Sequence, residues 1–163
     1  MYKRQLTPCI PNLLFEKKLT LRGTKREIEI HHLGGGHTVS DSIMYLPEDQ
    51  IMFSGDLVLK HNHPWLGHGN PKKWLSILDL LNELEIRRIV PGHGPVATKQ
   101  DLNVISEYIY DMINLVESLK KDGNTIEEAL HTPIPQKYSE WYCSPVFEWN
   151  IRFLYEYLDK VKS

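Results

Sequence analysis

The stretch GGGHTVSDSIMYLPEDQIMFSGD, residues 34–56, decides how this 163-residue chain folds. It contains two short apolar runs, residues 43–46 and 51–53, which are separated by the turn-forming sequence PEDQ at residues 47–50. Apolar runs bounded by turn residues predict the two strands of a β-hairpin. A candidate metal ligand stands at each end of the stretch, because His37 follows three glycines and Asp56 follows Ser54 and Gly55.

A third candidate ligand, His93, stands in the sequence PGHGP at residues 91–95, directly after a short strand predicted near residues 87–90. His37, Asp56 and His93 therefore each stand at the end of an apolar run, where a side chain can project from a rigid edge into a cleft. Neighbouring glycines permit positive φ angles and close backbone approach. Two imidazoles and one carboxylate predict a divalent metal site, and their order and spacing are more specific than any one of them alone.

The rest of the chain predicts strands first and helices afterwards. Leu19 and Leu21, then Ile28 and Ile30, alternate with polar residues around Gly23, which predicts a half-buried hairpin. Helical apolar spacing predicts helices over residues 71–84, from about 98 to 122, at 125–130 with a capping box, and from 144 onward. We therefore expect an α+β fold in which helices cover a mostly antiparallel sheet, with residues 1–163 forming a single domain.

Composition excludes several classes of function. A formal net charge of −2 predicts neither nucleic-acid nor anionic-membrane binding, and no apolar run is long enough to span a membrane. Cys9 and Cys143 are far apart and lack C-x-x-C spacing, so neither a disulfide framework nor a thiolate zinc site is predicted. If Met1 is the true first residue, the absence of an apolar signal segment predicts a cytoplasmic protein. A small molecule is the expected binding partner.

The motifs around His37, Asp56 and His93 together resemble the second half of the metallo-β-lactamase fold superfamily, from about Asn12 to the end of the chain. The sequence HPWLG at residues 63–67 and the Trp-rich closing segment resemble its broad-specificity hydrolases. The resemblance implies an αβ/βα sandwich, of which this chain supplies mainly the second half, so that residues 1–163 form a partial domain.

The resemblance also implies a metal site and a reaction. By position, His37 binds a first Zn²⁺ ion, Asp56 bridges both ions and His93 binds the second. The implied activity is hydrolysis, in which metal-bound hydroxide attacks an ester, thioester, amide or phosphoester. A lyase or an oxidoreductase on the same scaffold stays open, because fold and ligands do not determine the reaction.

The chain departs from the family in one large respect. The family's His-x-His-x-Asp-His motif, which supplies two ligands to each zinc ion and the acid–base aspartate, is not found before residue 37. Three ligands shared by two ions fall short of the roughly four-coordinate shell of zinc. We therefore expect weak zinc binding and no activity from this chain alone. It can be a truncated sequence, a chain completed by a second copy or a separate N-terminal half, or a non-catalytic binding module that keeps the fold.

Four further residues have candidate roles near the site. His61 and His63 have His-x-His spacing but follow Asp56, so we expect one of them, His63, to line the substrate cleft and the other to be solvated. Asp41 has two possible roles, either holding the His37 loop or accepting a turn amide at a strand start. Lys60 is interpreted as a solvated surface lysine.

Overall fold

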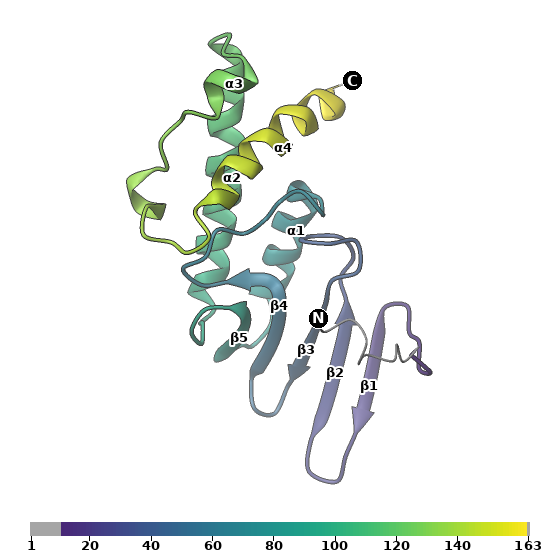
Figure 1. Ribbon diagram of the computed structural model, residues 1–163. Helices are drawn as coiled ribbons and strands as arrows, with labels where there is room; N and C mark the ends of the chain where they lie inside the picture. The colour runs from purple at the N-terminus through teal and green to yellow at the C-terminus, as the bar shows by residue number, and fades with distance from the viewer. Residues whose placement is uncertain (1–10, 163) are drawn as a thin grey trace, which may run out of the picture.

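The computed structural model describes residues 11–162, which form one five-stranded sheet followed mainly by helices (Figure 1). The strands are β1 (Lys18–Arg22), β2 (Glu27–His32), β3 (Ser42–Leu46), β4 (Ile51–Leu59) and β5 (Arg88–His93). They lie in the order β1-β2-β3-β4-β5, and all neighbours are antiparallel except the parallel pair β4 and β5. Both predicted hairpins and the predicted α+β class are confirmed.

The helices begin and end close to the predicted positions. They are α1 (Pro71–Asn82), α2 (Gln100–Lys121), α3 (Ile126–Ala129), the 3₁₀ turn η1 (Gln136–Tyr138) and α4 (Pro145–Lys162). The Asn70 side chain accepts the Lys73 backbone N–H at 3.0 Å, which satisfies a donor that the first turn of α1 would leave free. The predicted capping box of α3 is also present between Thr125 and Glu128.

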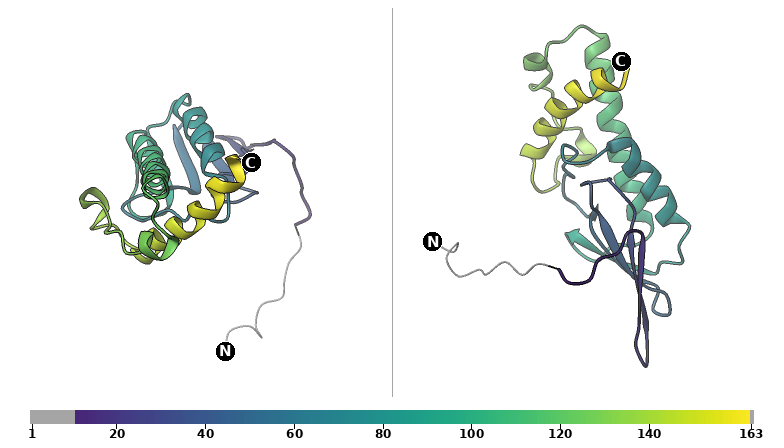
Figure 2. Two further views of the ribbon diagram at one scale, coloured as in Figure 1. Left: turned by 90° about the horizontal axis from the view of Figure 1, so that it is seen from above. Right: turned by 90° about the vertical axis from the view of Figure 1, so that its right-hand side faces the viewer.

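One face of the sheet is packed against the helices. Along β3 and β4, Ile43, Tyr45 and Met52 are buried, whereas their neighbours Met44 and Phe53 are exposed. The Tyr45 hydroxyl donates to the backbone carbonyl of Glu85 at 2.8 Å, just beyond α1. The core therefore lies between this face and the helices, which Figure 2 shows in two further views.

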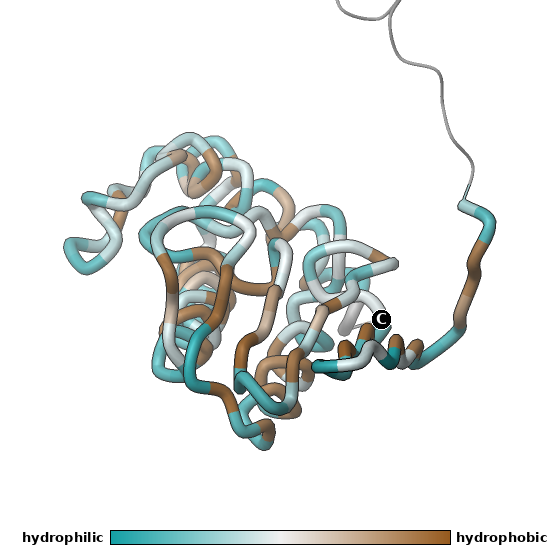
Figure 3. Tube along the Cα trace, turned by 90° about the horizontal axis from the view of Figure 1, so that it is seen from below, coloured by the Kyte–Doolittle hydropathy of each residue, from teal (hydrophilic) through white to brown (hydrophobic). Residues whose placement is uncertain are grey.

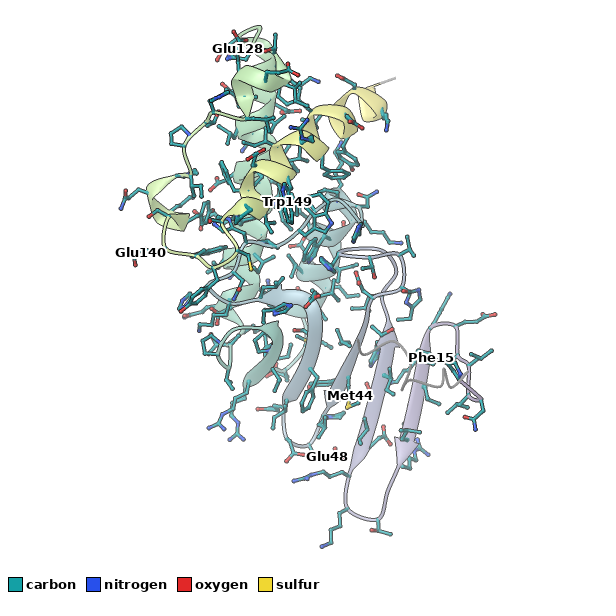
Figure 4. All side chains as sticks on the ribbon, viewed as in Figure 1. Phe15, Met44, Glu48, Glu128, Glu140 and Trp149 are labelled. Atoms are coloured by element: carbon teal, nitrogen blue, oxygen red, sulfur yellow. The ribbon has the colours of Figure 1, made fainter. Side chains whose placement is uncertain are left out.

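The opposite face of the sheet carries an apolar row that crosses all five strands. The register of the strands pairs Leu19 with Ile30, Ile30 with Met44, Met44 with Phe53 and Phe53 with Val90. Met44, labelled in Figure 4, remains 38% exposed, and Phe53 remains 41% exposed. Hydrophobic positions along the strands are visible from below in Figure 3. A contiguous apolar surface of this kind is uncommon on monomeric proteins.

Helices α2 and α4 pack together through one apolar face each. Their fully buried residues follow helical spacing, as predicted: Leu102, Ile105, Ile109, Met112 and Val116 on α2, and Ile151, Leu154 and Leu158 on α4. The polar faces of both helices stay in solvent. Within residues 11–162, no helix combines the length and hydrophobicity that spanning a membrane requires.

Candidate metal centre

The three sequence-predicted ligands meet at one edge of the sheet. Asp56 lies between the two histidines: its Oδ2 is 3.6 Å from His37 Nε2, and its Oδ1 is 3.5 Å from His93 Nε2. The side chains become more exposed from His37 to Asp56 to His93, at 14%, 37% and 62%. Each oxygen of one carboxylate thus faces a different imidazole.

The parallel pairing of β4 and β5 brings Asp56 and His93 together. Leu59 pairs with His93 across the two strands, and the Lys60 backbone N–H donates to the His93 carbonyl at 3.0 Å. Gly92 is required at its position, because a Cβ there would overlap both the Asp56 carboxylate and the backbone of Gly55 and Asp56. A glycine beside the predicted ligand therefore permits the close approach that the site needs.

The ring of His37 is oriented by a backbone carbonyl. Its Nδ1 donates to the carbonyl of Trp65 at 3.0 Å, and the ring stands edge-on to Trp74 at 5.4 Å. Because a carbonyl only accepts hydrogen bonds, the proton of neutral His37 is on Nδ1, and the Nε2 lone pair faces Asp56. This is the arrangement in which histidine ligates a metal, with the other ring nitrogen held by a hydrogen-bond acceptor.

Asp41 holds the loop that carries His37. Its carboxylate accepts the backbone N–H groups of Gly36 and Thr38, both at 3.0 Å, and the Thr38 hydroxyl at 2.7 Å. The sequence left open whether Asp41 holds the His37 loop or accepts a turn amide. It does both, because the amides from which it accepts hydrogen bonds belong to that loop.

A pocket of about 240 Å³ adjoins the three residues. Its lining combines the three candidate ligands with mainly apolar neighbours: His37, Asp56, Leu59, Asn62, His63, Trp65, His93, Cys143 and Val146. Three larger hollows, of about 250, 350 and 520 Å³, contain none of the three ligands. The chemistry of the donor groups therefore favours the smaller pocket as the functional one.

Comparison with known proteins identifies the family of this chain. Residues 6–93 match the family model of the metallo-beta-lactamase superfamily. The chain belongs to this superfamily. It is 26% identical over 112 residues to the metallo-beta-lactamase type 2 of Bacteroides fragilis, a match that covers 61% of this chain and 44% of that protein. It is 33% identical over 79 residues to the beta-lactamase-like protein 2 homolog of Caenorhabditis elegans, covering 45% of this chain and 24% of that protein.

Solved structures of the superfamily share the fold. A metallo-beta-lactamase from Pontibacter korlensis is 27% identical with a TM-score of 0.56, covering 61% of this chain and 49% of that one. A metallo-beta-lactamase family protein from Thermus thermophilus has a TM-score of 0.70 at 21% identity, covering 95% of this chain and 51% of that one. The chain spans less than half the length of the two curated relatives named above.

The donor groups of this superfamily member are enough for part of a two-ion metal site and too few for a complete one. Within residues 11–162, no three His, Cys, Asp or Glu side chains are grouped so that they could hold a metal ion. The tautomer of His37 and the two-sided position of Asp56 suit a pair of ions, each touching one imidazole and one carboxylate oxygen. Each ion would then have two ligands from these residues, where zinc takes about four.

We expect the substitution Asp41→Ala to loosen the His37 loop. Removing the carboxylate leaves the Gly36 and Thr38 amides without their acceptor, so hydrogen exchange at both amides should accelerate by roughly tenfold or more, as when a hydrogen bond worth about 1.5–3 kcal/mol is lost. Zinc affinity should fall about 10- to 100-fold, as for other residues that orient ligands. The exposed neighbour Ser42→Ala is the control. Equal exchange rates in the two variants would contradict a loop-holding role.

His61 and His63 lie in different environments. His61 is exposed, whereas His63 is only 2% exposed and its Nδ1 lies 3.0 Å from the Tyr108 hydroxyl. The His63 ring is enclosed edge-on by Tyr108, Trp141 and Phe147. His63 forms part of the pocket wall, and its spacing from His61 does not produce a ligand pair.

Burial of His63 predicts a pH dependence of stability. Burial lowers the pKa of the His63 imidazole, and the nearby Tyr138 backbone opposes this only in part. Below the unfolded value of about 6.5, the unfolded chain binds a proton that the folded chain does not, so stability falls as pH falls. Between about pH 7.5 and 5.5, wild type should lose more unfolding free energy in urea titrations than His63→Gln. His61→Gln should behave as wild type, and parallel losses in all three proteins would refute the assignment.

The expectation for Lys60 was wrong. Its ammonium donates to Asp101 Oδ2 at 3.1 Å, and its side chain is only 23% exposed. Asp101 also accepts the Thr98 backbone N–H at 2.7 Å, just before α2. Burial tends to raise the pKa of Asp101, but Thr98 and Lys60 outweigh it, so the pKa of Asp101 lies below its ordinary value. Lys60 therefore joins β4 to α2 and is held away from the pocket.

Sequence reasoning also missed a buried polar group behind the site. Asn150 on α4 is fully buried. Its Oδ1 accepts a hydrogen bond from the Leu66 N–H at 2.9 Å. Its Nδ2 donates to the Pro64 carbonyl at 2.8 Å and to the Tyr108 hydroxyl at 3.2 Å. These contacts hold the backbone on both sides of Trp65, whose carbonyl orients His37. The available signal was an asparagine on the apolar stripe of the last predicted helix.

Proposed function

We propose that this chain supplies one half of the dinuclear zinc site of a hydrolase. The observation that carries the proposal is the position of Asp56, whose two oxygens each face a different imidazole Nε2 at 3.6 and 3.5 Å. A carboxylate in that position bridges two cations. A zinc pair, when bound, supplies a hydroxide nucleophile near neutral pH.

The chain's own residues position the donor atoms. His37 is kept in the ligating tautomer by Trp65, and its loop is held by Asp41. His93 is held beside Asp56 by the β4–β5 pairing and remains the most exposed of the three. The half-site is thus shaped before a metal binds, which reduces the ordering cost of coordination.

We propose that the other ligands come from a second half of the fold or a second copy of this chain. Support comes from the two donors that the described residues give each ion, and from relatives of which the match covers only 44% and 24% of the length. The apolar row across the sheet, from Leu19 to Val90, would be buried by such a second layer.

The proposed reaction is hydrolysis of an ester, thioester, amide or phosphoester bond by the completed site. The rival function is a non-catalytic binding module, which is favoured by the shortage of donors within residues 11–162. Zinc content and turnover distinguish the two functions.

The test uses the full chain, purified and dialysed against zinc. Bound zinc is measured by elemental analysis, and hydrolysis is followed with chromogenic ester, thioester, amide and phosphoester substrates. About two zinc ions per chain pair, with turnover of one class, supports the hydrolase completed by a second copy. Zinc bound without turnover supports a site whose remaining ligands come from a separate second half. A chain that retains no zinc at a free concentration of about 1 mM overturns the proposal in favour of the binding module.

A further inference from the structure

We propose that the pocket beside Asp56 is an apolar subsite that takes an uncharged hydrocarbon group of the substrate, about the size of a phenyl ring. The substrate of the proposed site then carries such an uncharged group next to the bond that is hydrolysed. This inference rests on the proposed function, since it assigns the substrate class of that same site.

The size of the pocket limits what can enter it. Its volume of about 240 Å³ lies above the roughly 150 Å³ in which a protein cavity binds benzene. It lies below the roughly 300–1,000 Å³ of sites that enclose drug-sized ligands. The pocket therefore has room for a ring or short acyl chain together with its carbonyl group.

The wall of the pocket is apolar and held in place. Leu59, Trp65 and Val146 line it, and Leu59 is only 6% exposed. The Trp65 ring packs edge-on against Trp149 of α4, labelled in Figure 4, at 6.0 Å between centroids.

The Trp65 ring is also confined by the chain just after it. It lies against Gly67, where any Cβ would overlap the indole, so glycine at this position makes room for the ring. Phe153 lies 6.2 Å from the same ring. A rigid aromatic wall binds an apolar group without paying to order the side chain.

The same residue joins this wall to the metal ligands. The Trp65 carbonyl orients His37, and Trp65 is also one of the residues that line the pocket. A hydrocarbon group bound in the pocket therefore lies beside His37 and Asp56, so that the bond it is attached to is held next to the site.

The charges around the pocket disfavour an anion. Among the described residues no Lys or Arg lines it, and Asp56 is its one carboxylate. Lys60, the lysine closest to Asp56 in the sequence, is paired with Asp101 at 3.1 Å. In the zinc-free chain, an anionic group in this pocket would lose hydration and meet a carboxylate without a compensating cation.

The experiment compares two ligands that share a ring but differ in charge. Benzamide and benzenesulfonate are titrated into the zinc-free full chain, because bound zinc would itself attract the sulfonate. Binding is followed by NMR at the Trp65 indole N–H and by protection of the pocket thiol Cys143 from N-ethylmaleimide, in a Cys9→Ser background. We expect benzamide to bind at least about tenfold more tightly, which corresponds to about 1.4 kcal/mol.

A variant that adds a cation to the wall tests the cause. Val146→Lys should reverse or abolish the preference, because benzenesulfonate then gains a counter-ion. Glu148→Lys changes the net charge in the same direction at an exposed position outside the pocket and should keep the preference. NMR spectra of both variants establish that they are folded.

The outcomes separate the subsite from the metal site. Equal binding of the two ligands, tighter binding of the sulfonate, or no binding of either at about 10 mM would each overturn the subsite. Zinc uptake is measured separately on the same protein. A benzamide preference without zinc uptake supports the subsite and contradicts the proposed hydrolase. Zinc uptake without a benzamide preference supports the metal site and contradicts the subsite.

Discussion

The substitution Asp56→Asn should lower the zinc affinity of this chain by at least about 100-fold. Losing a residue that merely orients a ligand costs about 10- to 100-fold, and Asp56 is proposed to contact both ions directly. The amide keeps one oxygen acceptor but removes the negative charge that a bridging ligand shares between two cations. His37 and His93 would then face a neutral group across 3.6 and 3.5 Å.

The measurement is an NMR zinc titration that follows the ring signals of His37 and His93, which detects even millimolar binding. Asp79→Asn, at an exposed position on α1, is the control and should bind zinc as wild type does. Asp56 is partly exposed at the sheet edge, so the melting temperature of the zinc-free variant should not change. An Asp56→Asn chain with wild-type zinc affinity would eliminate the proposed bridge.

The parts of the fold that follow from local patterns were predictable. Alternation at residues 19–30 indicated a hairpin, and Thr125 with Glu128 indicated a helix start, because both signals lie within a few residues. The convergence of His37, Asp56 and His93 was also predictable, but the sequence placed each of them after a strand, whereas Asp56 lies within β4 and His93 is the last residue of β5. Their role as ligands remains a proposal, because proximity alone does not establish coordination.

Long-range side-chain partners could not be predicted in the same way. Lys60 and Asp101 are 41 residues apart, and Leu66 and Asn150 are 84 residues apart, so no periodic pattern relates them. The apolar runs at residues 43–46 and 51–53 are continuous, so the sequence did not show that Met44 and Phe53 face away from Ile43 and Met52. It did not show which of the two faces the helices cover, because that depends on how distant segments pack.

The substitution Asn150→Ala should destabilise the fold by about 3 kcal/mol or more. It removes three hydrogen bonds from a fully buried side chain and leaves the Leu66 N–H and the Pro64 carbonyl without a partner. Each buried polar group left unsatisfied costs about 1–3 kcal/mol. Arg152→Ala, at an exposed position on the same helix, should cost less than about 0.5 kcal/mol in the same urea titration.

The same variant should disturb the metal centre without touching a ligand. Asn150 holds the backbone on both sides of Trp65, and the Trp65 carbonyl determines which nitrogen of His37 carries the proton. When that segment loosens, His37 should populate both tautomers, which ring ¹⁵N chemical shifts distinguish under conditions where the protein is still folded. A stable Asn150→Ala protein would contradict the predicted loss of stability. A destabilised one in which His37 keeps a single tautomer would mean that Asn150 supports the core but does not orient the site.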